Sequence, residues 1–588
     1  MPFNDAQNLK AVSILTCANL LCRSHVELAE GYSKARKVID TLFPSSSLEQ
    51  LSLMTRQQLL KRLDTFADPP STSEDFSHDD LLVLEPLTEQ NFTWDEFSEH
   101  DSETSRIADD VNGLAFSRQS LNTSYLGLSS VPTILRVIAH IRPGIQKRVS
   151  EDSQAWRSSS WLMTCSDEPS ILQIDEASLV DAYFDRIHTI IPMIDEAEFR
   201  YRYDLTKLSP DSTNPWLALL NMVLAMGSLA SDSMHFNSHN IFYKRALSYL
   251  SITSFGSGHI YMVQALALYS GMALHFFNRP NTASAIMGAT IQMAVAMGLH
   301  RVQRFRVDMN SPCCPTTGTA DTQIGTWWTL LCLDTWASST LGRPSPGYWN
   351  PATVTTPIPS TLRSSDHGMI SLAASESFCR IAARIQERLI QLPIISLEEA
   401  KEFDRDLLGW KDSLHAFLAH KEQCPSNLHI ARATMWWRYI TTRLILYRPT
   451  LLITAVRRKP WDGLSTNERT ALRNCVEIAI EGIDMMSIEW SPNQVICWNI
   501  AWNLFQVALV LVLCMMSHED LAKEYKCNAG CTRSRKILQL LFDNARDLEA
   551  ETTSHEGHIM SHLALDSLNF DLLGEDIDWL AEFCGGAP

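Results

Sequence analysis

Positive charge is scarce in this sequence. Its 588 residues include 49 lysines and arginines against 67 aspartates and glutamates, so the net charge is −18. Contact with nucleic-acid phosphates requires clustered lysine and arginine, which excludes a chain that coats nucleic acid over its whole length. The short basic runs at residues 34–37 and 457–459 are weak nuclear-import signals and are more typical of a solvated helix face.

A long apolar run and a secretory signal are also lacking. The longest apolar stretch, Val507 to Met516, is shorter than the roughly 18 residues that indicate a membrane span. It predicts a buried helix instead. The start of the chain, Met1 to Asp5, has no basic segment followed by an apolar core. We therefore expect an intracellular protein with no membrane contact.

The motifs of common enzyme classes are missing. There is no Gly-x-Ser-x-Gly elbow, no phosphate loop ending in Gly-Lys-Ser/Thr and no Gly-x-Gly-x-x-Gly turn. His235 and His239 are four residues apart but have no third ligand nearby, and residues 555–558 lack the spacing of a zinc-protease helix. Asp79-Asp80 lacks the further carboxylate that a terpene cyclase would need, so a helical enzyme of that kind is only a remote alternative. We expect no enzyme and no catalytic or cofactor-binding residue.

Cysteine spacing gives no metal site. The fourteen cysteines are scattered, and two close pairs are Cys17 with Cys22 and Cys527 with Cys531. Two thiolates cannot close a tetrahedral zinc site without other ligands. We expect reduced thiols that pack as small hydrophobic groups or lie at the surface.

Helical periodicity dominates what is present. In residues 179–188, apolar residues recur at i, i+1, i+4, i+5 and i+8, which places one stripe against a core. Further helices are expected at 215–229, 261–277 and 283–297. Gly298 is placed to cap the last of these. No alternating β-branched run competes, so the predicted fold class is all-α, a large domain of packed amphipathic helices.

We divide the chain into five segments. Residues 1–62 form a short helical N-terminal region, and residues 63–170 an acidic, largely disordered linker, in which residues 63–110 hold 15 acids and a single arginine. The main helical domain follows at 171–360. Its helical C-terminal extension spans 361–550, with breaks expected near Pro393, Pro425 and Pro449, and an acidic-hydrophobic tail spans 551–588.

A series of motifs occurs in a fixed order between residues 178 and 344 and continues further on. Its members are Tyr183-Phe184 with His188, Pro192 and Phe199; Arg279-Pro280-Asn281; Gly298-Leu299-His300-Arg301; Trp327-Trp328; Asp334; Gly342-Arg343-Pro344; and Tyr447-Arg448-Pro449. This series resembles the fungal-specific transcription factor domain, the middle homology region of zinc-cluster regulators. The segments 84–96 and 124–127 resemble the linker found upstream of that domain.

These motif residues are interpreted as markers of the fold. The tryptophans are expected in the core, because large rings dominate buried area. Arg343 and Arg448 are expected to bind carbonyl oxygens at helix ends or to pair with buried acids such as Asp334. One departure is that residues 323–326 are uncharged, where the family usually has basic residues.

The zinc cluster that normally accompanies this domain is absent from the sequence. It needs six cysteines interleaved with basic residues, and residues 1–62 occupy its expected position without them. Two explanations stay open: an upstream exon that this sequence lacks, or a protein that acts without its own cluster. We favour a truncated or diverged N-terminus. No cofactor is evident, and zinc is expected only if an upstream cluster exists.

The tail has the composition of an activation segment. Residues 566–583 carry six acids and no basic residue between apolar side chains. The candidate activation residues are Phe570, Leu573, Trp579, Leu580 and Phe583. Acids keep such aromatics solvated until they dock in a coactivator groove. The alternative is a last amphipathic helix packed on the domain.

The resemblance implies a nuclear regulator of RNA polymerase II transcription, which we interpret as an activator of fungal metabolic genes. These are genes either for the use of a carbon source or of a secondary-metabolite gene cluster. Its expected partners are promoter DNA, bound directly or through a partner regulator, and transcriptional coactivators. A homodimer and a small-molecule effector also fit. The alternative is a cofactor or repressor that does not itself bind DNA.

Overall fold

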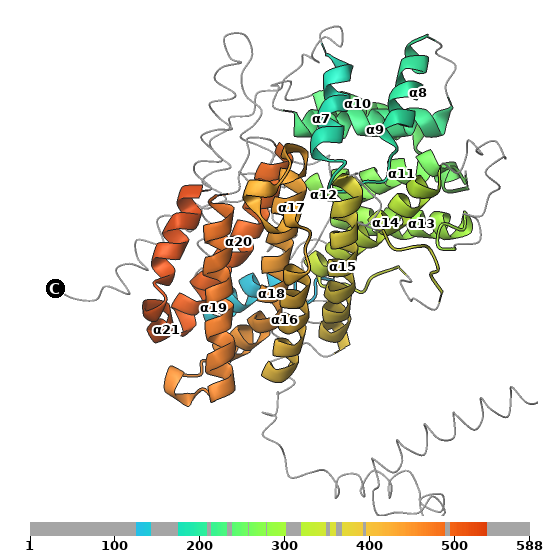
Figure 1. Ribbon diagram of the computed structural model, residues 1–588. Coiled ribbons are helices and arrows are strands. Elements are labelled where there is room, and N and C mark those ends of the chain that lie inside the picture. Colours follow the sequence, from blue (N-terminus) through green and yellow to red (C-terminus); the bar gives the residue numbers. More distant parts are fainter. Residues whose placement is uncertain are drawn as a thin grey trace, which may run out of the picture. The chain divides into compact units, whose positions relative to one another are not determined.

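The computed structural model describes the following parts of the chain: residues 125–142, 174–208, 213–231, 238–256, 258–277, 279–301, 319–347, 353–359, 367–391, 395–488 and 494–537. All of them belong to one compact unit, which spans His78–Pro588. The regular elements among them are all helices and include no strand, which confirms the predicted all-α class (Figure 1).

The N-terminal half of the described helices runs from α5 to α14. These elements are α5 (Val131–Ile141), α7 (Glu176–Arg186), α8 (Glu196–Leu208), α9 (Asn214–Ala230), α10 (Ser238–Tyr249), the 3₁₀ turn η3 (Ile252–Gly256), α11 (Ile260–Leu268), the π-helical turn η4 (Tyr269–Ala273), α12 (Leu274–Phe276), α13 (Pro280–Ala296) and α14 (Ala320–Leu341).

The C-terminal half runs from α15 to a last helix at residues 527–537. Its elements are α15 (His367–Gln391), α16 (Leu397–Asp412), α17 (Ala416–Ala419), the 3₁₀ turns η6 (Lys421–Gln423) and η7 (Ser426–Leu428), α18 (His429–Val456), the 3₁₀ turn η8 (Trp461–Gly463), α19 (Thr466–Met486), α20 (Gln494–Ser517) and α21 (Glu519–Glu524).

The first helices form where the apolar stripes predict them. The stripe of α7 includes Leu179, Val180 and Tyr183, which are all buried. The Asp175 side chain caps this helix by accepting a hydrogen bond from the Ala177 N–H at 3.1 Å. Behind it lies α9, which is apolar around almost its whole circumference because α7, α10 and α11 all pack against it.

The C-terminal half is built around α18, α19 and α20, which pack against one another (Figure 1). Ser396 and Glu399 form a reciprocal capping box at the start of α16, and Ser465 and Glu468 do the same for α19. Each box satisfies two N–H groups that a helix start otherwise leaves unpaired. The Ser-x-x-Glu sequence therefore fixes where these two helices begin.

One predicted break is wrong. Pro449 lies inside the 28-residue helix α18 rather than at its end. A proline there removes one backbone hydrogen bond and costs about 3 kcal/mol. The flanking side chains of Tyr447, Leu451 and Leu452 are almost completely buried, and their burial offsets that cost. Pro425 does separate η6 from η7, and Pro393 lies outside the described residues.

Part of the predicted linker belongs to the helical unit. Residues 125–142, which lie within the segment 63–170, include helix α5, which packs on α18 and α20. Ile134 and Val137 of this helix have no exposed surface. The ordered unit therefore includes residues well before position 171.

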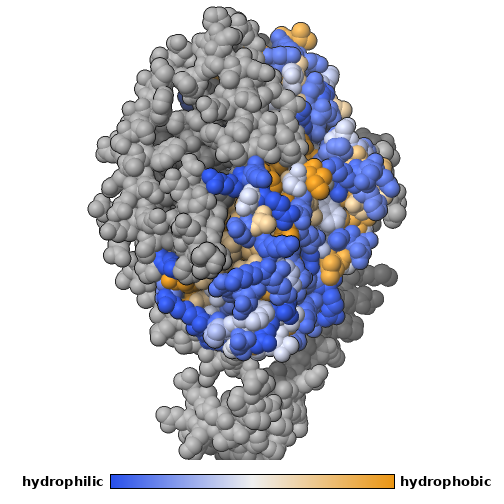
Figure 2. Space-filling model, turned by 90° about the vertical axis from the view of Figure 1, so that its left-hand side faces the viewer, coloured by the Kyte–Doolittle hydropathy of each residue, from blue (hydrophilic) through white to orange (hydrophobic). Residues whose placement is uncertain are grey.

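The apolar side chains of the described helices face inward. On the side of the molecule that Figure 2 shows, the described surface is mostly hydrophilic, with small hydrophobic areas. Within α20, Val495–Ser517 is long and apolar enough to cross a bilayer, but 83% of its most apolar window is buried inside the unit. Its apolar character is accounted for by its place between other helices.

Candidate functional site

The family motifs predicted from the sequence meet at residues 125–130. Arg343 donates from Nε to the Tyr125 carbonyl oxygen at 2.8 Å and from Nη2 to Asn281 Oδ1 at 2.7 Å. Arg448, which is 1% exposed, donates to the carbonyl oxygens of Leu128 and Ser129. Both arginines thus bind carbonyl oxygens, one of the two roles expected for them. They hold the segment before α5 against two distant parts of the chain.

Two glycines make this junction possible. The Gly127 N–H donates to the Leu341 carbonyl oxygen at 3.0 Å, which brings it beside Gly342. A Cβ atom on Gly127 would lie 2.2 Å from the Gly342 carbonyl oxygen, closer than any side chain can approach. Gly342 itself ends α14 with φ 69°, the left-handed conformation that favours glycine. Pro344, the last residue of the Gly342-Arg343-Pro344 motif, is exposed.

A second group of motif residues lies where α13 ends. Gly298 adopts φ 78° after the last turn, and the Leu299 N–H donates to the Ala294 carbonyl oxygen at 3.0 Å, the pattern of a Schellman cap. The carbonyl oxygens of Leu299 and His300 accept hydrogen bonds from Thr356 Oγ1 and the Thr355 N–H. The Arg301 side chain is exposed.

The tryptophan pair connects this group to the core. Trp327 and Trp328 are each 1% exposed. The Trp327 ring lies 5.8 Å from the His300 ring, and Trp328 Nε1 donates to the Pro357 carbonyl oxygen at 2.7 Å. Burial and the charge of Arg301 lower the pKa of His300, which keeps its ring neutral at physiological pH.

Two buried acids hold loops and helices together. Asp334 in α14 accepts hydrogen bonds from the Ser345 hydroxyl and from the Gly347 N–H, which fixes the turn after the Gly-Arg-Pro motif. Asp404 in α16 accepts from Arg443 at 2.6 Å and from the Tyr447 hydroxyl at 3.0 Å. Tyr447 therefore connects the Tyr447-Arg448-Pro449 motif to α16.

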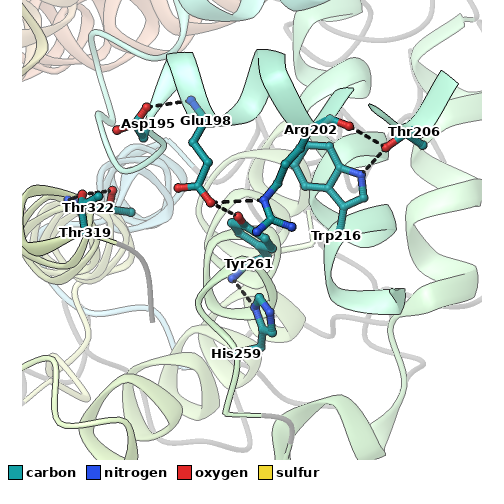
Figure 3. Close-up of polar contacts among 9 residues, drawn as sticks. All are labelled: Asp195, Glu198, Arg202, Thr206, Trp216, His259, Tyr261, Thr319 and Thr322. Atoms are coloured by element: carbon teal, nitrogen blue, oxygen red, sulfur yellow. Dashed lines mark hydrogen bonds and ion pairs between the residues drawn. The ribbon is translucent and has the colours of Figure 1, made fainter. Parts of the chain in front are cut away.

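A polar cluster holds α8 against α9 and α11 (Figure 3). Glu198 accepts from Arg202 Nε at 3.2 Å and from the Tyr261 hydroxyl, and the Arg202 guanidinium lies 4.9 Å from the Tyr261 ring centre. Trp216 Nε1 donates to Thr206 Oγ1 at 2.8 Å. Each group has a partner within the cluster, so we interpret it as structural support.

The described part of the chain also contains a central cavity with a volume of about 230 Å³. Its lining residues come mainly from η4, α12, α14, α15, α18 and α20. The π-helical turn η4 contributes Gly271 and Met272, and such turns frequently occur at functional sites. The cavity is therefore a candidate binding site.

Aromatic side chains and one cation characterise this cavity. Phe276, Phe378, Trp498 and Trp502 are among its lining residues. Arg438 of α18 also lines it, with its guanidinium carbon 3.1 Å from the ring centre of Trp336. Among the lining residues that the structure describes, none is an aspartate or glutamate. The site thus combines aromatic and other apolar side chains with neutral polar groups and a single positive charge.

Arg438 has an unusual electrostatic environment. Among the residues that the structure describes, none is an acid within ion-pair distance of its guanidinium group, and none accepts a hydrogen bond from it. Burial lowers the pKa of Arg438 to about 9, which still leaves it charged at neutral pH. Burial and then the charge of Arg343 lower the pKa of His275, which also lines the cavity, to about 4, so this ring is neutral. The cavity therefore presents one net positive charge.

Comparison with known proteins explains the order of the motifs. A family model described as the fungal specific transcription factor domain matches residues 180–379. The chain contains a fungal specific transcription factor domain. This confirms the resemblance found in the sequence. No solved structure matches the chain.

Curated relatives of this domain are transcription regulators. The chain is 26% identical over 322 residues to the lactose regulatory protein LAC9 of Kluyveromyces lactis, an alignment that covers 54% of this chain and 33% of that protein. It is 31% identical over 187 residues to transcription factor FBD3 of Gibberella moniliformis, covering 30% of this chain and 23% of that protein. Over 183 residues it is also 31% identical to transcription factor FBD3 of Fusarium pseudograminearum, with the same coverage. The chain thus spans a third or less of the length of these relatives. Neither the family nor these relatives are enzymes.

The match to the transcription factor domain ends within α15, at residue 379. The walls from η4, α12 and α14 lie inside the matched region, whereas Arg438 of α18 and the tryptophans of α20 lie beyond it. None of the family motifs includes Arg438, although Tyr447-Arg448-Pro449 lies on the same helix. One sequence pattern could have indicated this cavity. Asn499, Asn503 and Gln506 form a polar stripe beside Trp498 and Trp502 on the otherwise apolar helix α20, and all five residues line the cavity.

Other predicted features have separate outcomes. Cys527 and Cys531 are free and buried, in agreement with packed thiols. Within the described ranges, no group of three or more His, Cys, Asp or Glu side chains is placed to hold a metal ion. The candidate activation residues and the whole N-terminal segment 1–62 lie outside the described residues.

Proposed function

We propose that this protein regulates transcription in the fungal nucleus and that it activates metabolic genes, among them a secondary-metabolite gene cluster. The match of residues 180–379 to the fungal specific transcription factor domain carries the proposal. It is supported by the relatives, one of which is named a lactose regulatory protein and two of which are named transcription factors.

The helical unit supplies the regulatory part in this proposal. Its motif residues fix the packing of α5, α13, α14 and α18, and its central cavity offers a place for a signal to bind. The acidic-hydrophobic tail, residues 566–583, supplies the activation segment. Promoter DNA is reached either directly or through a partner regulator.

Deletion of the gene, followed by transcript sequencing and by chromatin immunoprecipitation of the tagged full chain, tests the proposal. We expect a defined group of metabolic transcripts to fall and the tagged protein to occupy their promoters. Unchanged transcripts under all growth conditions, together with no promoter occupancy, would contradict it. A rise of the same transcripts would replace the activator with a repressor.

Two further measurements separate the mechanisms. If the purified chain binds a target promoter with stoichiometric zinc, it is a direct DNA-binding factor. If it binds only together with a second regulator, it is a cofactor.

For the tail, alanine at Phe570, Leu573, Trp579, Leu580 and Phe583 is expected to abolish reporter activation. Alanine at Ser567 and Asn569 is the matched control and is expected to leave activation unchanged.

A further inference from the structure

We propose that the central cavity binds a small organic monoanion, an aromatic or strongly apolar carboxylate whose charged group pairs with Arg438. This binding does not depend on the function proposed above. Only the role of the ligand as an effector of transcription rests on it.

The size of the cavity limits the ligand. At about 230 Å³ it is larger than the cavities of roughly 150 Å³ that hold benzene in other proteins. It therefore has room for an aromatic ring system with a short substituent. It is too small for a nucleotide, a long acyl chain or a peptide.

The walls determine the body of the ligand. Phe276, Phe277, Phe378, Trp498 and Trp502 all line the cavity, and the ring centres of Phe276 and Trp498 are 6.2 Å apart. Planar rings gain more from such walls than flexible chains do, because aromatic pairs favour offset or edge-to-face contacts beyond area burial alone. The polar groups of Asn499, Asn503 and Gln506 along α20 could orient a substituent.

The charge determines the functional group. A guanidinium group in a low-dielectric cavity is costly without a counter-charge, and a carboxylate pairs with it through two parallel hydrogen bonds. The ring of Trp336 covers one face of the Arg438 guanidinium and leaves the N–H edges of the planar group for such a pair. A cationic ligand would be repelled, and a neutral one would leave Arg438 without a partner.

The number of charges is also limited. Arg438 is the only arginine or lysine in the lining that the structure describes, and the His275 ring is neutral because its pKa lies near 4. A dianion such as a phosphate monoester would bring one negative charge without compensation. The lining thus favours a monoanion over a phosphorylated ligand.

The test uses the purified full chain and measures ligand binding by calorimetry and by the shift in Tm. The probes are indole-3-acetate and 3-phenylpropionate, each paired with its neutral amide, and tryptamine as a cation of similar shape. We expect both carboxylates to raise Tm and to bind at least ten-fold more tightly than their amides. We expect no shift with tryptamine. The absence of a shift with either carboxylate would overturn the proposal.

Variants then test whether Arg438 is the group that binds the carboxylate. Arg438→Met is expected to lose at least ten-fold in carboxylate affinity and to bind the amides as the wild type does, whereas Arg438→Lys recovers part of the loss. The control is Arg384→Met in α15, an exposed arginine outside the cavity, which should bind like the wild type. Equal carboxylate affinity in Arg438→Met and the wild type would refute the assignment.

The stability of the empty protein provides an independent check that does not require a ligand. If Arg438 is kept for a ligand, Arg438→Met removes a partly buried charge that has no acidic partner among the described residues, and its Tm without ligand is equal to or above that of the wild type. If Arg438 only supports Trp336, the same variant is less stable and no carboxylate binds. Because both readouts come from purified protein, a negative result here is distinct from a negative transcript experiment.

Discussion

Replacing Asp404 by asparagine should destabilise the C-terminal half strongly. Asp404 and Arg443 have side-chain exposures of 12% and 14%, and two hydrogen bonds of 2.6 and 3.2 Å join them. Burial would by itself lower the pKa of Arg443, but the hydrogen bonds and charge of Asp404 raise it above its ordinary value. The folded state therefore depends on this carboxylate to keep a buried guanidinium charged.

The expected cost follows from the charge that remains. Removing one partner of a buried ion pair costs about 3 to 5 kcal/mol, because the other charge loses its compensation. Arg443 keeps a second, half-exposed acid, Glu481, at 3.3 Å, so we place Asp404→Asn at the lower end, about 3 kcal/mol. The amide oxygen can still accept from the Tyr447 hydroxyl, but the amide NH2 then faces Arg443 Nε, so the 2.6 Å hydrogen bond is lost together with the charge.

Asp406→Asn is the matched control. It lies two residues along the same helix and also pairs with an arginine, Arg384 at 2.9 Å, but both side chains are exposed, at 62% and 44%. Exposed pairs contribute about 0 to 1 kcal/mol and are screened by salt.

Urea unfolding of the full chain, followed by circular dichroism at low and high salt, compares the two variants. A difference below about 1 kcal/mol between them would show that Asp404 is not the counter-charge on which Arg443 depends.

Three other changes test separate features. Gly127→Ala should lower the free energy of unfolding by about 1 to 3 kcal/mol, because its Cβ meets the Gly342 backbone. The control Gly409→Ala, at an exposed helical site with no neighbour within 4 Å, should instead raise it by about 0.5 to 1 kcal/mol. Equal effects of the two variants in urea unfolding would contradict the close approach of Gly127 to Gly342. Burial, partly offset by Glu468, lowers the pKa of His518 from 6.5 to about 4. The unfolded chain therefore takes up the proton first, and stability that is complete above pH 6.5 falls toward pH 4. Between pH 7 and pH 5 the loss due to His518 should be about 2 kcal/mol, and a His518→Gln variant with the same pH slope as the wild type would exclude this role. Trp328→Phe leaves the Pro357 carbonyl oxygen without its donor and should lower stability by about 1 to 3 kcal/mol, whereas an unchanged urea midpoint would show that solvent replaces the indole.

The helices could be predicted where one face alone is apolar. The stripe at residues 179–188 and the glycine at 298 are local signals, and the structure has α7 and the end of α13 there. The path of α18 through Pro449 could not be predicted, because the burial that offsets the proline comes from residues far apart in sequence. The same holds for α5, whose partners are α18 and α20.

The cavity was harder to predict than the motifs. The contact between Arg343 and Asn281 joins two motifs that the sequence had already singled out, although not as neighbours. Arg438, by contrast, stands in the sequence between Trp437 and Tyr439 and resembles any arginine of a buried helix. Its lack of an acidic partner is a property of the packed structure, and no spacing rule expresses it.

The division of the cavity between two parts of the chain has an evolutionary consequence. One wall belongs to the region that the family shares, and the other, with Arg438, belongs to helices beyond it. Duplicated genes could therefore keep the shared scaffold and diverge in what they sense through a few substitutions on α18 and α20. Relatives grouped by the residue at position 438 and by its neighbours on those helices would then share a ligand. Relatives grouped by the sequence of the shared region would share only their descent.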